Sequence, residues 1–140
     1  KIILYKDPKN DYINKFVFFG IGSAVLLIIH SIFLGIKFEY ELYKLFRRVV
    51  ILFFIVFEII AQTYLVICLY KIRHSISENI NEIFLKLKIF LVSLLIIVAL
   101  ISIPIISVPG NKYLKHALEW DYFVGVISFY LLTFFMWKKN

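Results

Sequence analysis

Long stretches of apolar residues alternate with short polar segments along this chain. Four stretches reach or approach the roughly 20 residues that a helix needs to cross ~30 Å of hydrocarbon, and they cover residues 16–36, 49–70, 89–108 and 120–137. Each unpaired backbone group in lipid costs several kcal/mol, so segments of this kind must be helical. The pattern predicts an all-α, polytopic integral membrane protein.

The polar segments between these spans are short. No Gly-rich linker, charge block or internal repeat divides the chain, so residues 1–140 are expected to form a single membrane domain. Short connections force neighbouring spans to run antiparallel, which predicts an antiparallel four-transmembrane-helix bundle. Within residues 71–88, isoleucine and leucine recur at helical spacing. This favours extensions of spans two and three joined by a tight turn, with an amphipathic helix on the membrane as the alternative.

Composition excludes a soluble fold. The 140 residues are 62% hydrophobic with a mean hydropathy of +0.90, whereas soluble domains are about 45–50% apolar. The single cysteine, Cys68, cannot form an intrachain disulfide. The net charge of +7 could indicate nucleic-acid binding, but the bases lie in short loops beside the spans. Membrane topology and anionic headgroups explain them better, so membrane lipids are expected as partners and nucleic acid is not.

The basic residues also predict an orientation. Ten of them lie on the side that holds both termini: Lys1, Lys6, Lys9, Lys15, Lys71, Arg73, Lys86, Lys88, Lys138 and Lys139. Six lie on the other side: Lys37, Lys44, Arg47, Arg48, Lys112 and Lys115. The positive-inside rule then places both termini on the cytoplasmic or matrix side of the membrane.

Glu58 is the charged residue that lies deepest in an apolar run, near the middle of the second span. A carboxylate is costly there and must be neutral, paired or directed toward the bundle interior. Gln62 lies one turn further on, and His30 of span one is expected at a similar depth in an antiparallel pair, within roughly 4 Å along the axis. The three residues form a candidate intramembrane polar site. Either it carries a proton or ligand, or it is a structural contact between helices.

Two further groups of residues are candidates for contacts. Small residues fall on one face of span one, where another helix can approach closely, and this expected helix-packing face consists of Gly20, Ala24, Ser31 and Gly35. Its partner is another span or another subunit. At the entry to span four an interfacial cluster is expected to contact headgroups or cap the bundle, and it consists of Lys112, His116, Glu119, Trp120 and Asp121. Metal binding by this cluster is the weaker alternative, and no metal site is expected.

Span four carries a resemblance to a known family. Residues 113–120 read YLKHALEW and precede an aromatic helix with SFYLLTF at 128–134. This pattern resembles the last membrane helix of the Frag/DRAM/Sfk family, and a glycine-containing helix, a short loop and a helix with Tyr64-Leu65 precede it in a similar order. The resemblance implies that the chain covers the last four of six helices in a lipid-associated protein linked to anchor remodelling, autophagy or lipid asymmetry. The residues carried over are His116, Glu119 and Trp120, without a catalytic role.

Motifs typical of enzymes are absent. The sequence contains no HExxH, no Walker-type glycine loop and no GxSxG, so neither an enzyme nor a cofactor is expected. We expect a non-catalytic multi-pass membrane protein that acts through lipid and helix–helix contacts. One alternative is an accessory subunit of a larger assembly, such as a respiratory or energy-transducing complex, which would dock through the small-residue face of span one. Another is a proton or ion pathway around Glu58 and His30.

Overall fold

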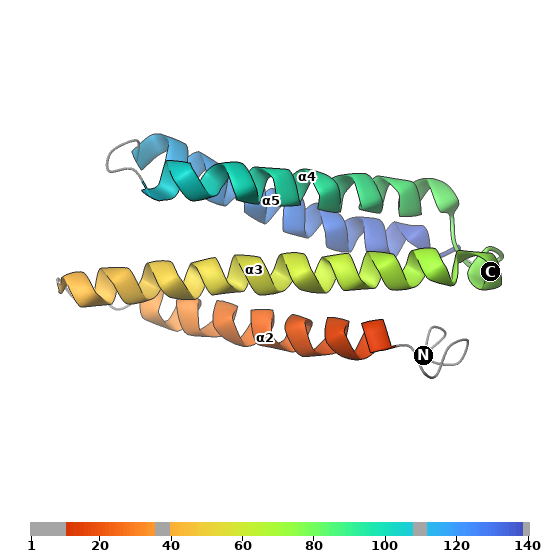
Figure 1. The fold of residues 1–140 in the computed structure, drawn as a ribbon, viewed down its shortest axis with the longest axis horizontal. Coiled ribbons are helices and arrows are strands. Elements are labelled where there is room, and N and C mark those ends of the chain that lie inside the picture. Colours follow the sequence, from red (N-terminus) through yellow and green to blue (C-terminus); the bar gives the residue numbers. More distant parts are fainter. Residues whose placement is uncertain (1–10, 36–39, 108–111, 139–140) are drawn as a thin grey trace. The chain divides into compact units, whose positions relative to one another are not determined.

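The described part of the chain folds into four α-helices and one short 3-10 helix, as the computed structural model shows (Figure 1). The structure describes residues 11–35, 40–107 and 112–138, with side chains described except at Leu34, Glu41, Lys44, 103–107, Lys112, Lys115, His116 and Glu119. The elements are α2 (Asp11–Leu34), α3 (Glu41–Lys71), η1 (Arg73–Ile76), α4 (Glu82–Ser107) and α5 (Lys112–Met136). The prediction of an all-α chain with four apolar helices is confirmed.

The helices extend beyond the apolar stretches that predicted them. α3 begins at Glu41 rather than near residue 49, and α4 begins at Glu82 rather than near residue 89. An apolar run marks only the part suited to hydrocarbon, whereas helix propagation continues into the polar flanks at little cost once the helix exists. Within the described residues, three helical segments are long and apolar enough to cross a membrane, and α5 contributes a shorter one. The segments are Asp11–Phe33, Leu45–Lys71, Glu82–Ser102 and Trp120–Met136.

The connection between α3 and α4 is a compact turn. α3 ends at Lys71, η1 follows, and α4 starts at Glu82. Asn81 caps α4, because its side-chain oxygen accepts a hydrogen bond of 3.0 Å from the backbone N–H of Ile83. Residues 82–88 extend span three as predicted, whereas α3 ends at Lys71, one residue past the expected end of span two, and η1 lies in the turn between the two helices.

The chain divides into two compact units, residues 1–68 and 69–140. In the first unit, α2 and α3 form an antiparallel hairpin, since Phe19 contacts Phe57 and Phe33 contacts Phe46, both with ring centroids 5.2 Å apart. A Cβ atom on Gly22 would lie 2.6 Å from the Phe57 ring, so only glycine leaves room for the ring at this point. We call this unit the first hairpin.

In the second unit, α4 and α5 form another antiparallel hairpin (Figure 1). Its buried apolar side chains include Leu85, Val92, Leu95, Val126, Phe129 and Met136. The polar end is closed by the chain after α5. Asn81 N donates to Met136 O at 2.8 Å and Lys138 N donates to Asn79 O at 2.9 Å, which places the C-terminal end of α5 against the turn before α4. We call this unit the second hairpin.

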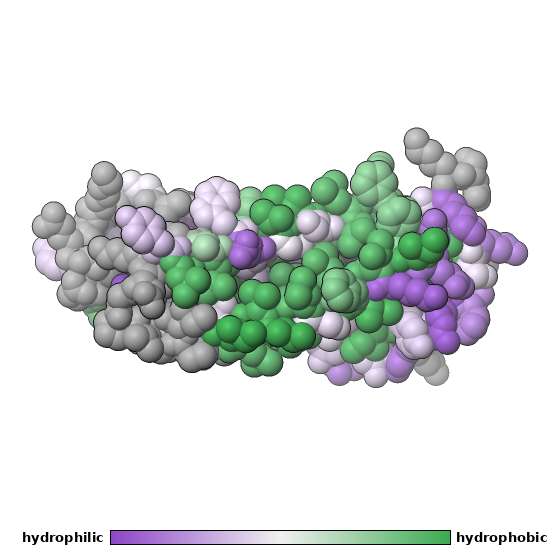
Figure 2. Space-filling model, turned by 90° about the horizontal axis from the view of Figure 1, so that it is seen from above, coloured by the Kyte–Doolittle hydropathy of each residue, from purple (hydrophilic) through white to green (hydrophobic). Residues whose placement is uncertain are grey.

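Hydrophobic and hydrophilic side chains are separated along the helices. In Figure 2 hydrophobic side chains predominate in the middle of the visible face, and hydrophilic ones gather at the right-hand end, near the α3–α4 connection. Large apolar side chains are exposed on every long helix, for example Phe18 on α2, Phe53 on α3, Phe90 on α4 and Phe134 on α5. A surface of this kind suits hydrocarbon rather than water, so the chain has the character of a multi-pass integral membrane protein.

Candidate functional site

Three polar side chains meet inside the first hairpin. The Ser23 hydroxyl of α2 donates a hydrogen bond of 2.6 Å to Oε2 of Glu58 on α3. Gln62, one turn further along α3, donates from Nε2 to Oε1 of Glu58 at 3.0 Å. The side chains are buried, with exposed fractions of 3% for Ser23, 3% for Glu58 and 1% for Gln62. Both carboxylate oxygens therefore accept a hydrogen bond from a neighbouring side chain.

The position of Glu58 in α3 explains why side chains must supply these donors. At 1.5 Å per residue, Glu58 is about 20 Å or more along the axis from either end of α3. Backbone N–H groups in mid-helix are already bonded to carbonyls, so only side chains can solvate a carboxylate there. Gln62 also carries a buried side-chain oxygen without a hydrogen-bond partner among the described residues. The cluster can act as a polar contact between two helices or as a proton-accepting group.

The register of α2 against α3 places Ser23 beside Glu58. His30 lies seven residues further along α2, which corresponds to about 10 Å along the helix axis. The expected Glu58–His30 pair would have to bridge that separation, so the geometry favours Ser23 as the α2 partner. Gln62 lies where the sequence indicated, and Ser23 is the member of the cluster that the sequence did not assign as a partner of Glu58.

The small-residue face of α2 does not pack on α3. Ala24, Ser31 and Gly35 are exposed, and a Cβ atom added to Gly20 would meet no atom within 4 Å. The glycine that does pack on α3 is Gly22. This face is therefore open along the first hairpin, and its expected role in contacting another helix stays a prediction.

Lys88 of α4 is a buried cation that sequence reasoning placed in a loop. Its exposed fraction is 0%, and its ammonium group donates a hydrogen bond of 2.6 Å to the Thr133 hydroxyl of α5. The same group lies 4.1 Å from the centroid of the Phe129 ring, a cation–π contact. Thr133 in turn donates to the Phe129 carbonyl oxygen at 2.8 Å. Among the described residues, no carboxylate forms an ion pair with Lys88.

The sequence does contain a signal for the burial of Lys88. Leu85, Val92 and Leu95 are buried on the same face of α4. Together with residue 88 they recur at intervals of three, four and three residues, which is the spacing of a buried helix face, or seam. Lys88 occupies one position of that seam, about 9 Å along the axis from the start of α4. An expected span beginning at residue 89 hid this pattern, because it assigned Lys88 to the polar loop.

Only part of the expected interfacial cluster is described. Trp120 and Asp121 are exposed at the α5 positions where they were expected, and Trp120 packs edge-on against Phe123 with centroids 6.2 Å apart. The side chains of Lys112, His116 and Glu119 lie outside the described residues. Across the described part of the chain, no group of three or more histidine, cysteine, aspartate or glutamate side chains is placed to hold a metal ion.

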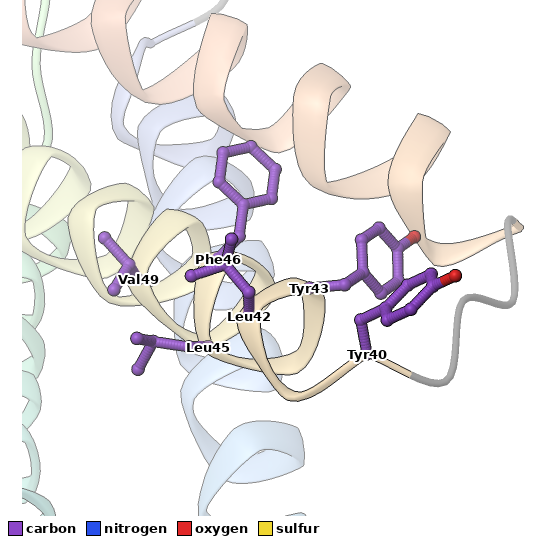
Figure 3. A pocket seen from close by; sticks show the side chains of 6 residues that line it. All are labelled: Tyr40, Leu42, Tyr43, Leu45, Phe46 and Val49. Atoms are coloured by element: carbon purple, nitrogen blue, oxygen red, sulfur yellow. The ribbon is translucent and has the colours of Figure 1, made fainter.

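An open apolar hollow lies at the beginning of α3 (Figure 3). Its volume is about 710 Å³, and its lining residues are Tyr40, Leu42, Tyr43, Leu45, Phe46 and Val49. The Tyr43 hydroxyl donates to the Phe33 carbonyl oxygen, which fixes the start of α3 against the end of α2. The lining offers apolar contact and no charged group, so it has no chemistry beyond holding an apolar chain.

Comparisons of this chain with protein-family models, curated proteins and solved structures found no match. The resemblance to the Frag/DRAM/Sfk family therefore stays a prediction that depends on residues 113–120 and 128–134.

Proposed function

We propose that the chain is a non-catalytic multi-pass membrane protein that acts through lipid and helix–helix contacts. In this proposal α5 completes a fourth transmembrane span, and the four helices form one antiparallel bundle. The observation that carries it is the exposed apolar surface of both hairpins, to which every long helix contributes large aliphatic or aromatic side chains. In water such a surface would cause aggregation, whereas lipid chains or other apolar helices cover it without cost.

Hydroxyl groups along the helices support a hydrocarbon environment. They donate to the carbonyl oxygen four residues earlier, at 2.6 to 2.9 Å, in Ser31, Thr63, Ser93, Ser102, Ser128 and Thr133. This local bond satisfies a hydroxyl without water. Helices that carry polar side chains through lipid need such bonds, because an unpaired polar group in hydrocarbon costs several kcal/mol.

The buried charged residues also suit a structural role. Glu58 is held by two side-chain donors and Lys88 by a hydroxyl and a ring. Neither lines the 710 Å³ hollow, whose walls are apolar and aromatic. These groups therefore serve the contacts between helices, and the outer surfaces are left to interact with lipid or partners.

A subunit role in a larger assembly is the second candidate, and the open small-residue face of α2 favours it. Ala24, Ser31 and Gly35 are exposed and would let another helix approach closely. Replacing Ala24 and Ser31 by leucine should then release a partner, whereas Val25→Leu on the exposed surface outside this face is the control. Unchanged association in the leucine variant would contradict this candidate.

Two measurements test the first proposal. Washing membranes with alkaline carbonate should leave the chain in the pellet, because embedded helices are not extracted by charge disruption. Native sizing after mild detergent extraction should give a monomer or small homo-oligomer that carries bound lipid. Release by carbonate overturns membrane embedding, and a large defined complex favours the subunit role instead.

A further inference from the structure

One end of the second hairpin has a fixed shape. Ile80, in the turn before α4, and Trp137, just after α5, form an antiparallel β-bridge. Beside this bridge the Lys138 ammonium group donates to the Ser77 carbonyl oxygen at 3.0 Å. The backbone after α5 is therefore attached to the turn before α4. Basic residues on both segments hold defined positions relative to one another.

Three basic side chains at this end have no carboxylate partner. Arg73 in η1, Lys86 in the second turn of α4, and Lys138 form no ion pair among the described residues, and we call these three residues the basic end. Glu78 and Glu82 are exposed nearby but form no ion pair with them. The cations are therefore available to an anion from outside the chain.

Aromatic and apolar groups lie directly beside the basic end. The Arg73 guanidinium stacks 4.0 Å from the centroid of the exposed Tyr70 ring, and Trp137 lies next to Lys138 in the chain. Apolar side chains that are exposed on α4 around Lys86 are Ile83, Leu87 and Phe90. Cations, interfacial aromatic rings and exposed apolar groups occur in this order at the level of lipid headgroups. A nucleic-acid surface would not need the exposed apolar band.

We propose that the basic end binds the phosphate groups of anionic lipids in the adjacent leaflet. The proposal rests on the proposed function, since it requires that the apolar helices are embedded. Phosphate oxygens would accept hydrogen bonds from Lys86, Lys138 and the guanidinium donors of Arg73 that do not bond to the Tyr70 carbonyl. Burial of Ile83 and Leu87 in the acyl region would bring these cations to phosphate depth.

Lipid selectivity of the reconstituted protein tests this proposal. The protein is placed in phosphatidylcholine vesicles, and the relative association of spin-labelled phosphatidylglycerol and phosphatidylcholine is measured by electron paramagnetic resonance. Each basic residue near an anionic leaflet contributes about 1 kcal/mol, or roughly a factor of five. We therefore expect the triple variant Arg73→Gln, Lys86→Gln, Lys138→Gln to lose a wild-type preference for phosphatidylglycerol by at least about fivefold.

The matched control removes the same charge from residues near the starts of α3 and α5 that lie outside the interfacial cluster, by Lys44→Gln, Arg48→Gln and Lys115→Gln, and should retain the preference. Arg73→Lys, which keeps the charge, should also retain most of it. Equal loss in the triple variant and the control overturns the location of the site. A wild-type preference that inorganic phosphate abolishes, at an ionic strength where chloride does not, shows a site for free phosphate and overturns the lipid proposal.

The carbonate wash separates this proposal from the one on which it rests. A chain that stays in the pellet but shows equal association with both lipids contradicts the basic end alone. A chain that carbonate releases contradicts membrane embedding, and the lipid site fails with it. Far-ultraviolet circular dichroism of the triple variant confirms that its helices are intact before selectivity is compared.

Discussion

The first and second hairpins each bury one charged side chain, and they do so in different ways. Glu58 lies near the middle of α3, and two side chains, Ser23 and Gln62, donate to its two oxygens. Lys88 lies close to the start of α4, where one hydroxyl, that of Thr133, and one aromatic ring receive its ammonium group. The carboxylate has more hydrogen-bond partners than the ammonium group, although both side chains are buried.

Depth in the helix accounts for this difference. A group about 20 Å or more from both helix ends cannot reach water, so the surrounding helices must supply its partners. A lysine side chain near a helix end has a long apolar stem and points back toward the N-terminus, so its ammonium group lies nearer to the interface. The mid-helix acid is therefore held by two side-chain hydrogen bonds, whereas the cation near the helix end has one hydroxyl as its hydrogen-bond partner and one aromatic ring beside it.

Loss of that hydroxyl is expected to have the largest effect on stability. Thr133→Val should lower the free energy of unfolding by about 2–3 kcal/mol, because it leaves a buried ammonium group without its hydrogen-bond acceptor. Unfolding in mixed micelles of mild detergent and dodecyl sulfate, followed by circular dichroism, measures this change. Adding Lys88→Met should restore most of the stability, since an apolar side chain of similar length needs no acceptor. An equal cost of Thr133→Val with and without Lys88 would show that the pair is not the cause.

A second contrast lies in the glycines where α2 meets α3 and where α4 meets α5. Their substitution is expected to have an intermediate effect on the free energy of unfolding. Gly22→Ala places a methyl group 2.6 Å from the rigid Phe57 ring, and overpacking of this kind costs about 1–3 kcal/mol. Gly125→Ala meets the end of the Leu95 side chain, which can change rotamer. Both substitutions gain about 1 kcal/mol in helix propensity, which should nearly offset the cost at Gly125 but not the larger cost at Gly22.

The same unfolding measurement compares the two alanine variants. Phe57→Leu in the Gly22→Ala background should recover stability, because a smaller and more flexible side chain makes room for the methyl group. Equal costs for the two glycine substitutions would mean that the close approach of α2 to α3 does not depend on Gly22.

The smallest effect is expected for Ser23→Ala. Hydrogen bonds between membrane helices are worth about 0.6 kcal/mol on average, and Gln62 continues to donate to the other oxygen of Glu58. Adding Gln62→Leu should cost more than the sum of the single substitutions, because the carboxylate then loses both of these side-chain hydrogen bonds. The double-mutant cycle measures this coupling. A loss for Ser23→Ala as large as that for Thr133→Val would mean that Glu58, like Lys88, depends on a single partner.

Much of the fold could be predicted from the chain alone, but the polar contacts could not. The apolar runs predicted four helices, and the unusual position of Glu58 identified a buried polar group before its partners were known. The choice between Ser23 and His30 depended on the register of two helices. Since each residue turns a helix by about 100°, a small error in register or rotation selects a different neighbour.

Lys88 illustrates a second limit of sequence reasoning. Its charge assigned it to a loop, whereas its place between Leu85 and Val92 is that of a buried seam residue. The charge of Lys88 predicts an exposed loop position, whereas the apolar spacing predicts a buried helix position. The buried position is possible because Thr133 on α5 accepts a hydrogen bond from the ammonium group. The open face with Ala24 and Ser31 shows the same limit. Small residues permit close packing on any neighbouring helix, so their positions in the sequence do not identify the partner.

The amino-acid sequence by itself predicted the all-α class and the four long apolar helices that the described residues form. The free energy of transferring a helix from water into hydrocarbon is close to the sum of the contributions of its residues. The length and composition of an apolar run are therefore sufficient to identify such a helix. Tertiary structure alone decided that Ser23 donates to Glu58 and that Thr133 receives Lys88. Those contacts depend on the rotation and register of one helix against another, which are set by the packing of many side chains at once.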